Sequence, residues 1–240
     1  MATAAIPKSS RVFLTARWSN VAILSYSVPP QVLQPLLPPE CELDLLDGQS
    51  YVSLVAFDFL QTRVWRVPWP GARNFPEVNL RFYVRHNGQR GVCFIREFVP
   101  CRIVALVARL FYNEPYSGVS MISEVEQSAD SISIRHEADV GGRRQSLRIT
   151  AGKPAIRPDE GTTEHFFKEH NWGYGTSRGG ELVRYRVEHE AWDVYPILSC
   201  ELDWDWPAVY GERWSILRDR RPDHVLLAAG SPVRVLRQED

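Results

Sequence analysis

The sequence predicts an α+β protein that is mainly antiparallel β, with a curved or barrel-like sheet around an internal cavity and a few peripheral helices. Stretches in which polar and apolar residues alternate recur along the chain, as is typical of strands. Asp47-Gly48, Asn87-Gly88 and Gly141-Gly142 separate pairs of these stretches, and such dipeptides favour tight turns between antiparallel strands. Hydrophobic residues make up 44% of the 240 residues, which is enough for a large core.

Charge and chain organisation narrow the class of protein. The chain has 28 Lys and Arg against 29 Asp and Glu, a formal charge of -1, and its arginines are spread along the sequence. This balance indicates no nucleic-acid-binding surface. Because no linker, repeat or low-complexity run divides the chain, we expect residues 1–240 to form a single domain.

The N-terminus and the cysteines bear on the compartment. The stretch MATAAIPKSSR lacks the apolar segment of a signal peptide, and no apolar run is long enough to span a membrane. The 4 cysteines show no C-x-x-C spacing, and Cys93 falls in the apolar phase of a predicted strand, as a buried free thiol would. We therefore expect a reduced cytoplasmic protein with no membrane contact, no metal and no cofactor.

The first predicted strand covers residues 12–26 and leads to Pro29-Pro30, after which a short helix is predicted over residues 32–37. Arg17 interrupts this otherwise apolar and hydroxylic strand. It could point into the interior, or it could lie on the surface and cover Trp18.

A hairpin is predicted next, with strands over residues 42–46 and 51–59 around Asp47-Gly48. Asp58 is a candidate cavity carboxylate, although aspartates at strand ends more often cap turns. The following WRVPWPGARN carries Trp65 and Trp69, and it is either an aromatic flap at the cavity mouth or a loop that covers the core.

The central hairpin has strands over residues 77–85 and 89–99, joined by Asn87-Gly88. Its polar face is either the wall of a cavity, with partly desolvated charges, or an ordinary solvent face. A two-residue loop sets the register, with Tyr83 opposite Val92, Arg81 opposite Phe94, Asn79 opposite Arg96 and Glu77 opposite Phe98.

After the hairpin, apolar residues recur with a period near 3.6 from Cys101 to Tyr112, which predicts an amphipathic helix packed on the hairpin. Asn113 is its candidate C-cap, and Pro115 prevents its continuation. The tight turn that follows can place the side chain of Tyr116 accurately.

The rest of the chain completes the sheet. Strands are predicted over residues 119–126, 131–140 and 143–150, and a helix over residues 163–170. A long strand region over residues 181–202, broken at Pro196, and a closing strand over residues 224–236 follow. Trp204, Trp206 and Trp214 lie in a loop or short helix between them.

Several stretches together resemble a known superfamily. They are L-T-A-R-W-S-N near the start, F-P-E-V-N-L-R in the central hairpin, A-R-L-F-Y then P-Y at the end of the predicted helix, and H-E-A-W near the end. Their order resembles the acetoacetate decarboxylase-like superfamily, in particular its YqjF-like branch. The resemblance implies the fold, and it implies that Arg17 matches an arginine of the decarboxylase active-site cavity.

The same resemblance bears on covalent chemistry. In the decarboxylases two lysines follow the proline that ends the helix, and one forms a Schiff base; here Tyr116 and Ser117 occupy those positions. Of the three lysines in the chain, Lys8 lies in a terminal tail, Lys168 on a polar helix segment, and Lys153 in a turn that could reach inward. Because an imine needs a neutral amine, we predict no Schiff-base activity.

Two other motifs do not fit their usual structural context. Residues 175–179 match G-x-S-x-G, but a nucleophile elbow needs a strand before it and a helix after it, whereas the order here is helix, loop, strand. His189-Glu190 begins like a zinc signature but has no second histidine four residues on. His189 could still face the cavity, or it could be a structural histidine of the sheet.

The candidate catalytic residues are Glu77 and Tyr116, and the candidate substrate-binding residues are Arg17, Arg81 and Tyr83. In an enzyme acting on a small carboxylate or keto acid, Arg17 would bind the carboxylate, Glu77 would act as acid or base, and Tyr116 would donate a proton or hydrogen bond. We also expect Glu77 and Arg17 to approach each other across the interior, because their mutual charge would offset desolvation.

Two other classes of function remain open. The same cavity could bind a small anionic ligand without turnover. Alternatively, the tryptophan-rich segments could anchor a protein interface, with a homodimer as one such assembly.

Overall fold

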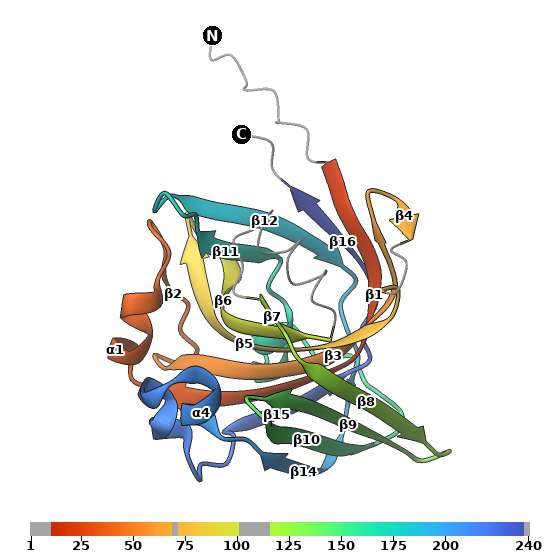
Figure 1. Ribbon diagram of the computed structural model, residues 1–240. Helices are drawn as coiled ribbons and strands as arrows, with labels where there is room; N and C mark the ends of the chain where they lie inside the picture. Colours follow the sequence, from red (N-terminus) through yellow and green to blue (C-terminus); the bar gives the residue numbers. More distant parts are fainter. Residues whose placement is uncertain (1–10, 69–71, 101–115, 238–240) are drawn as a thin grey trace.

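The computed structural model describes residues 11–68, 72–100 and 116–237. Within these residues the chain forms a large curved sheet and a smaller four-stranded sheet packed beneath it in Figure 1. The helix expected over residues 101–112, its C-cap Asn113 and the proline after it lie outside the described residues.

The large sheet is organised around β1 (Arg11–Val28), which pairs with β3 along one side and with β16 and then β15 along the other. From β16 the pairings continue through β12, β11, β6 and β5 to β3, so the sheet curves round towards β1 (Figure 1). The other strands of this path are β3 (Ser50–Val64), β5 (Phe75–His86), β6 (Gln89–Val99), β11 (Trp172–Thr176), β12 (Leu182–His189), β15 (His224–Ala228) and β16 (Pro232–Arg237).

Four short strands extend this sheet: β2 (Glu42–Leu43), β4 (Val67–Pro68), β7 (Tyr116–Gly118) and β13 (Val194–Tyr195). The small sheet consists of β8 (Ser120–Gln127), β9 (Ser131–Val140), β10 (Arg143–Gly152) and β14 (Ile197–Asp203), all antiparallel. The three strands predicted over residues 119–150 are therefore present almost as expected.

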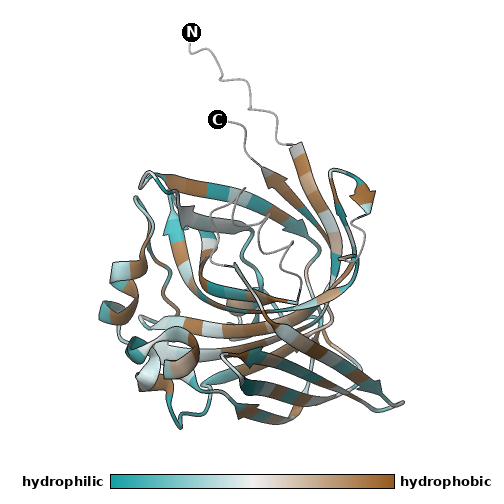
Figure 2. Ribbon diagram, viewed as in Figure 1, coloured by the Kyte–Doolittle hydropathy of each residue, from teal (hydrophilic) through white to brown (hydrophobic). Residues whose placement is uncertain are grey.

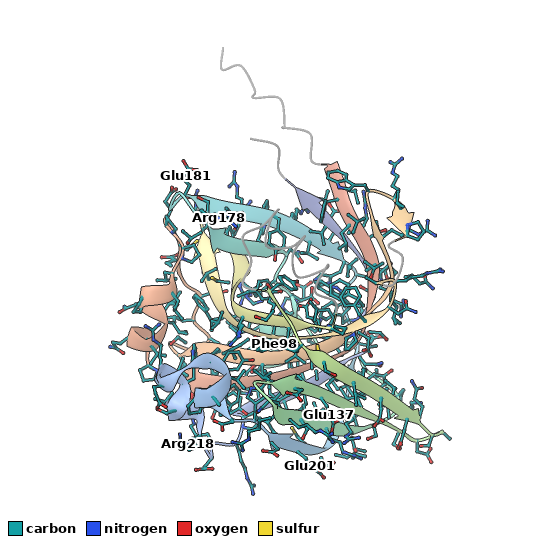
Figure 3. All side chains as sticks on the ribbon, viewed as in Figure 1. Phe98, Glu137, Arg178, Glu181, Glu201 and Arg218 are labelled. Atoms are coloured by element: carbon teal, nitrogen blue, oxygen red, sulfur yellow. The ribbon has the colours of Figure 1, made fainter. Side chains whose placement is uncertain are left out.

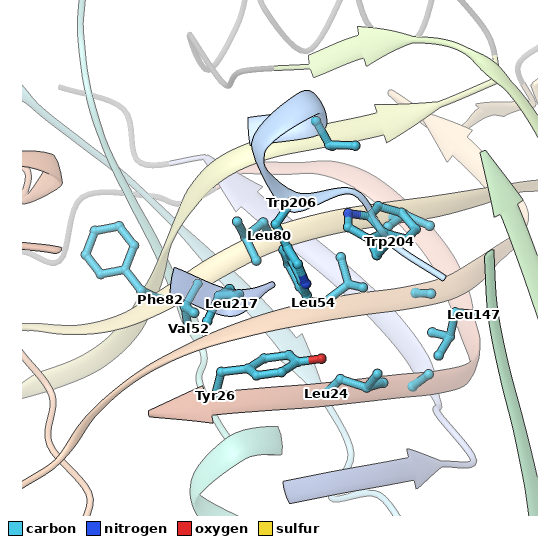
Figure 4. Close-up of a cluster of buried hydrophobic side chains, with 14 of the residues drawn as sticks. Leu24, Tyr26, Val52, Leu54, Leu80, Phe82, Leu147, Trp204, Trp206 and Leu217 are labelled. Carbon is cyan, nitrogen blue, oxygen red and sulfur yellow. The ribbon is translucent and has the colours of Figure 1, made fainter. Parts of the chain in front are cut away.

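The large sheet is buried on both faces because successive side chains point to opposite sides. One alternate set, which includes Leu24, Leu54 and Leu80, forms a core against the small sheet (Figure 4). The other set, which includes Val55 and Tyr83, faces the inside of the curve. Figure 2 shows hydrophobic and hydrophilic residues following one another along the strands.

The helical elements are short. α1 (Pro30–Leu33) and the 3-10 turn η1 (Gln34–Leu36) match the helix expected after Pro29-Pro30. α4 (Trp206–Tyr210) and η2 (Glu212–Leu217) form the tryptophan-bearing connection, and they bury Trp206 and Trp214 in the core between the sheets. α3 (Thr163–Lys168) has six residues, and its N-cap is Thr162, whose hydroxyl accepts a hydrogen bond from the backbone amide of His165.

Three expectations about strand pairing need correction. The turn at Asp47-Gly48 is present, but β2 pairs with β5 rather than with the strand after the turn. The predicted strand region over residues 181–202 is broken at residues 190–193 as well as at Pro196, and its last part belongs to the small sheet. The closing strand is two strands, β15 and β16, with a turn at Gly230, where a Cβ atom would lie 2.1 Å from the Trp18 carbonyl oxygen.

The central hairpin follows the predicted register only near its turn. Tyr83 pairs with Val92 and Arg81 with Phe94, as expected. A β-bulge at Ile95 then shifts the register, so that Asn79 lies opposite Glu97 instead of Arg96.

The predicted fold class is confirmed in its main features, namely a mainly antiparallel β structure with a large curved sheet and few helices. Among the described residues, no helix is long and apolar enough to cross a membrane.

Candidate functional site

The inside of the curved sheet holds a cavity of about 150 Å³, a volume that suits a molecule of about the size of benzene. Figure 3 shows side chains crowding the inside of the curve. Most of the cavity wall is apolar and includes the aromatic residues Trp18, Phe57, Phe59, Phe75, Phe94 and Trp192. The polar face of the central hairpin therefore forms part of a cavity wall and not a solvent face.

Three neighbouring strands place polar side chains in one row at this wall. The bulge brings Glu97 of β6 opposite Asn79 of β5, and the parallel pairing of β7 with β6 brings Tyr116 beside Glu97. Glu77 lies two residues from Asn79 on β5, so its side chain points to the same side. Glu77, Asn79 and Glu97 are each at most 3% exposed.

Glu77 has polar partners on both carboxyl oxygens. Its Oε1 accepts a hydrogen bond from Asn79 Nδ2 at 2.9 Å, and its Oε2 accepts one from the Tyr116 hydroxyl at 3.1 Å. Burial raises the pKa of Glu77 to about 7, although hydrogen bonds with Asn79, Tyr116 and Glu97 and the charge of Arg81 oppose this rise. Two buried carboxyl groups that share a hydrogen bond favour a state in which one keeps its proton.

Tyr116 remains a proton donor in this arrangement. Burial raises the pKa of its hydroxyl well above the usual value, and the negative charges of Glu77 and Glu97 raise it further. The neutral phenol can therefore donate a hydrogen bond to Glu77 but does not provide a phenolate at neutral pH.

Arg81 brings a positive charge to the same wall. One of its terminal nitrogens, Nη2, donates to the Phe167 carbonyl oxygen at 3.2 Å. Its Nε is buried and has no hydrogen-bond partner within the described part of the chain. This nitrogen can donate to an acceptor on a bound molecule.

The helix α3 and the residues after it supply further polar groups to the wall, namely Lys168 and His170. The Lys168 side chain is 1% exposed, and its ammonium pairs with the Glu169 carboxylate. The expectation that Lys168 lies on a polar helix segment is wrong, because α3 is short and its last residue faces the interior.

The expectations for Arg17 and Tyr83 are not met. Arg17 is exposed and lies outside the cavity wall, because Trp18 takes the inward position and adjacent strand residues point to opposite faces. The predicted approach of Arg17 to Glu77 is therefore wrong. Tyr83 is buried behind the wall, where its hydroxyl bonds Ser53 Oγ at 2.6 Å.

The other candidates also have definite positions. Asp58 is not part of the cavity wall. Lys153 Nζ donates to the Ser128 carbonyl oxygen at 2.9 Å, at the turn between β8 and β9, so it does not reach inward. His189 does line the cavity, and its Nδ1 donates to the Glu190 carbonyl oxygen at 2.8 Å.

Three polar groups of the wall were missed by sequence reasoning. Glu97 lies on the opposite face in the regular register predicted for the hairpin, and only the bulge brings it to the wall. Lys168 and His170 carry no periodic signal of their own. Their one sequence cue is their position beside Phe166 and Phe167, an apolar pair that is buried over the inside of the curve. Within the described residues, no group of three or more His, Cys, Asp or Glu side chains could hold a metal ion.

Comparison with solved structures identifies the fold. The chain is similar to an acetoacetate decarboxylase from Legionella pneumophila, with a TM-score of 0.61 and 16% identity, over 99% of this chain and 90% of that one. It is also similar to an acetoacetate decarboxylase-like enzyme from Sphingomonas wittichii RW1, with a TM-score of 0.64 and 14% identity, over 98% and 96% of the two chains. The enduracididine biosynthesis enzyme MppR complexed with pyruvate matches with a TM-score of 0.63 and 14% identity, over 97% and 91%. The protein thus has an acetoacetate decarboxylase-like fold.

Sequence comparison gives the family. Residues 15–232 match the model of the DUF2071 family, described as an uncharacterized conserved protein. The chain is 30% identical over 183 residues to the uncharacterized protein YqjF of Bacillus subtilis (strain 168). The aligned region covers 73% of this chain and 72% of that protein. The chain belongs to the DUF2071 family and to its YqjF-like branch, as the resemblance of its sequence motifs implied.

Proposed function

We propose that this protein binds a small, largely apolar molecule with a carboxylate or carbonyl group, and that Glu77 and Glu97 transfer a proton to or from it. The observation that carries the proposal is a pair of buried, hydrogen-bonded carboxyl groups in the wall of a largely apolar cavity. Burying two carboxyl groups costs free energy, whereas burying apolar side chains of similar size at the same positions would not. The pair is therefore poorly explained by a role in stability.

The pKa of Glu77 supports an acid–base role. A group whose pKa is about 7 can both release and accept a proton near neutral pH, which is the range in which general acid–base catalysis is most efficient. The neutral Tyr116 hydroxyl would stabilise the carboxylate form of Glu77 by its hydrogen bond. The unpartnered Nε of Arg81 would bind an oxygen of the ligand, which favours an anionic or strongly polarised group there.

The reaction class that follows is a lyase or hydratase reaction in which a proton moves next to a carbonyl or carboxylate group without an imine. One fold relative is described as complexed with pyruvate, which makes small 2-oxo acids a reasonable first choice of probe. A thermal-shift screen of such acids identifies ligands, since a ligand at 100 times its Kd adds roughly 2.7 kcal/mol to the free energy of unfolding.

Proton transfer is testable even before the complete reaction is known. Wild-type protein is incubated with pyruvate or 2-oxobutanoate in D2O, and loss of the C–H signal next to the carbonyl is followed by NMR. Glu77→Gln should slow this exchange by about 10²-fold or more while the ligand still binds, because the amide has similar shape but cannot carry the proton.

The control is Glu181→Gln, which makes the same chemical change at an exposed residue between β11 and β12 (Figure 3). Exchange in this variant should equal that of the wild type. Equal exchange in the Glu77→Gln variant would contradict the catalytic proposal. Binding without exchange in the wild type would instead favour a ligand-binding protein that uses the same cavity.

A further inference from the structure

A second buried polar cluster adjoins the cavity on the side of α3, and it is centred on Asp44. This carboxylate is 1% exposed and has three partners: Arg85 Nε lies 2.6 Å from Oδ1, Arg90 Nε lies 2.6 Å from Oδ2, and His170 Nε2 lies 3.3 Å from Oδ2. His170 also forms part of the cavity wall. The cluster therefore connects a buried anion to the cavity through one imidazole ring.

Asp44 is ionised at neutral pH. Burial alone would raise its pKa, but the hydrogen bonds from His170, Arg90 and Arg85 and the charge of Arg90 lower the pKa to about 2. An ionised carboxylate can only accept hydrogen bonds. Each of its three partners must therefore donate.

This requirement determines the tautomer of His170. Burial and the nearby charges of Arg90 and Arg81 together lower the pKa of His170 to about 4, against the opposing effect of Asp44. The ring is therefore neutral near pH 7 and carries one proton, which must be on Nε2 to donate to Asp44. Its other nitrogen, Nδ1, is left with a lone pair that can only accept.

His170 Nδ1 is buried and has no hydrogen-bond partner within the described residues. The ring is fixed in place, because it packs on Tyr83 and Phe166 at 4.8 and 5.3 Å between ring centres. The Tyr83 hydroxyl is hydrogen-bonded to the Ser53 hydroxyl, which is hydrogen-bonded in turn to the Ser25 hydroxyl. A ring flip would remove the hydrogen bond to Asp44. Asn79 Oδ1 is a second buried acceptor of the wall, and it too has no hydrogen-bond partner in the part of the chain that the structure describes.

We infer that His170, oriented by Asp44, is a hydrogen-bond acceptor for the ligand, and that the ligand is a small hydroxy acid or hydroxy ketone. The oxygen of its carboxylate or carbonyl meets the unpartnered donor Arg81 Nε, and its hydroxyl donates to His170 Nδ1. This inference rests on the cavity of the proposed function, and it assigns Asp44 the role of a positioning residue.

The first test needs no ligand. In protein labelled with ¹⁵N-histidine, two-bond ¹H–¹⁵N correlation spectra at pH 7 distinguish the two neutral tautomers of each histidine. We expect His170 to carry its proton on Nε2, and Asp44→Asn should shift it towards Nδ1. A proton on Nδ1 in the wild type would overturn the inference, whatever the protein binds.

The second test uses two acids that differ only in the hydroxyl group, 2-hydroxy-3-methylbutanoate and 3-methylbutanoate. The wild type should prefer the hydroxy acid by at least tenfold in Kd, and this acid alone should move the His170 Nδ1 resonance upfield. His170→Leu should abolish the preference while the affinity for 3-methylbutanoate stays within about threefold; His170→Gln, which keeps an acceptor oxygen, should retain part of it.

The outcomes separate this inference from the proposed function. Equal binding of the two acids by the wild type, an unchanged preference in His170→Leu, or no binding of either acid overturns the role of His170. None of these results depends on proton exchange. Conversely, normal exchange in the Glu77→Gln variant overturns the catalytic proposal and leaves the hydroxyl preference in place.

Discussion

Glu77 shows how burial turns an ordinary side chain into one suited to proton transfer. Its pKa of about 7 arises mainly from desolvation, since the hydrogen bonds to Asn79 and Tyr116 act in the opposite direction. A surface glutamate with the same partners would be fully ionised at neutral pH. The property therefore belongs to the position on β5 and not to the residue type.

The raised pKa predicts a pH-dependent stability. Between pH 4.5 and about 7 the unfolded chain loses the Glu77 proton while the folded protein keeps it, so ionisation favours the unfolded state. The contribution of this residue to the free energy of unfolding is largest below pH 4.5 and falls as pH rises through 7, by on the order of 3 kcal/mol in total.

Urea unfolding of the wild type and of Glu77→Gln at several pH values between 4.5 and 7.5 measures this effect. The wild type should lose stability relative to the variant as the pH rises. His170 acts in the opposite direction, because its lowered pKa removes stability as the pH falls from 6.5 to about 4. The difference between the two proteins cancels that contribution, and a constant difference would show that the pKa of Glu77 is not raised.

Lys168 is the lysine that could support imine chemistry, because it lies on the cavity wall. Its ammonium is paired with the Glu169 carboxylate, and an ion-paired ammonium is not a nucleophile. Incubation with pyruvate and borohydride, followed by mass spectrometry, should therefore give no lysine adduct. A stoichiometric adduct that is absent from Lys168→Arg would replace the acid–base mechanism with a covalent one.

At the scale of elements, alternation and turn dipeptides predicted most strands well. The turns at Asn87-Gly88 and Asp47-Gly48 both have the positive φ angles that these residues favour. The bulge at Ile95 was not predictable, because one extra residue in a strand leaves no mark in an alternating pattern that is apolar on both sides. Glu77, Asn79 and Arg81 lie on β5, where the alternation is regular, and the sequence placed them on one face correctly. Glu97 lies beyond the bulge on β6 and was missed for that reason.

Arg17 was misplaced for a related reason. A strand buried on one face and partly covered on the other does not show which of Arg17 and Trp18 points inward. β1 has bulges between Thr15 and Arg17 and again after Ser19. Its sequence therefore does not show which residues point to which face of the sheet. The partner of β2 was also beyond prediction, since two residues carry too little pattern to choose a neighbour.

The contact of β11 with β6 predicts a sensitive position at Gly91. The two strands pair over only two residue pairs, and a Cβ atom on Gly91 would lie 2.5 Å from the Trp172 carbonyl oxygen and from the ring of Tyr174. Gly91→Ala should therefore lower the free energy of unfolding by at least about 2 kcal/mol, because the backbone of β11 must move.

Gly175→Ala on β11, the strand that pairs with β6, is the matched control, since a Cβ atom there has no neighbour within 4 Å. Chemical unfolding should show a change of less than about 1 kcal/mol for this variant. Equal destabilisation by the two substitutions would mean that the loss at Gly91 comes from glycine replacement in a strand and not from the close approach.

At the scale of the whole molecule, the large sheet separates the core between the two sheets from the cavity inside its curve. The core between the two sheets is closely packed, whereas the inside of the curve keeps space for a ligand. The sequence did not predict how the strands of residues 181–202 divide between the two sheets, because β13 and β14 are separated only by Pro196 and yet join different sheets. Which sheet a strand joins depends on contacts distant in sequence, and local pattern does not report them.

Adjacent residues of β3 should therefore respond differently to truncation. Leu54 faces the core between the sheets, and Leu54→Ala should cost about 2–5 kcal/mol of stability without changing ligand choice. Val55 lines the cavity, and Val55→Ala should cost only about 1–2 kcal/mol because it enlarges an existing space.

Unfolding and binding measurements on the two variants check this division. Val55→Ala should improve binding of 4-methylpentanoate relative to 3-methylbutanoate, and Leu54→Ala should leave that ratio unchanged. A changed ratio in Leu54→Ala would indicate that the core and the cavity are coupled.

The pairing of β1 with β16 has a mechanical consequence. The first residue of β1, Arg11, pairs with the last residue of β16, Arg237. A force that pulls the two ends of the chain apart therefore acts first on this pair, at one end of the β1–β16 pairing, and it acts perpendicular to the strands. Hydrogen bonds between antiparallel strands lie perpendicular to the strands, and such a force breaks them one after another instead of all at once. Pulled in this direction, the molecule should yield at low force and open first beside Phe13 and Val235, at the wall of the cavity, while the core between the sheets is still intact.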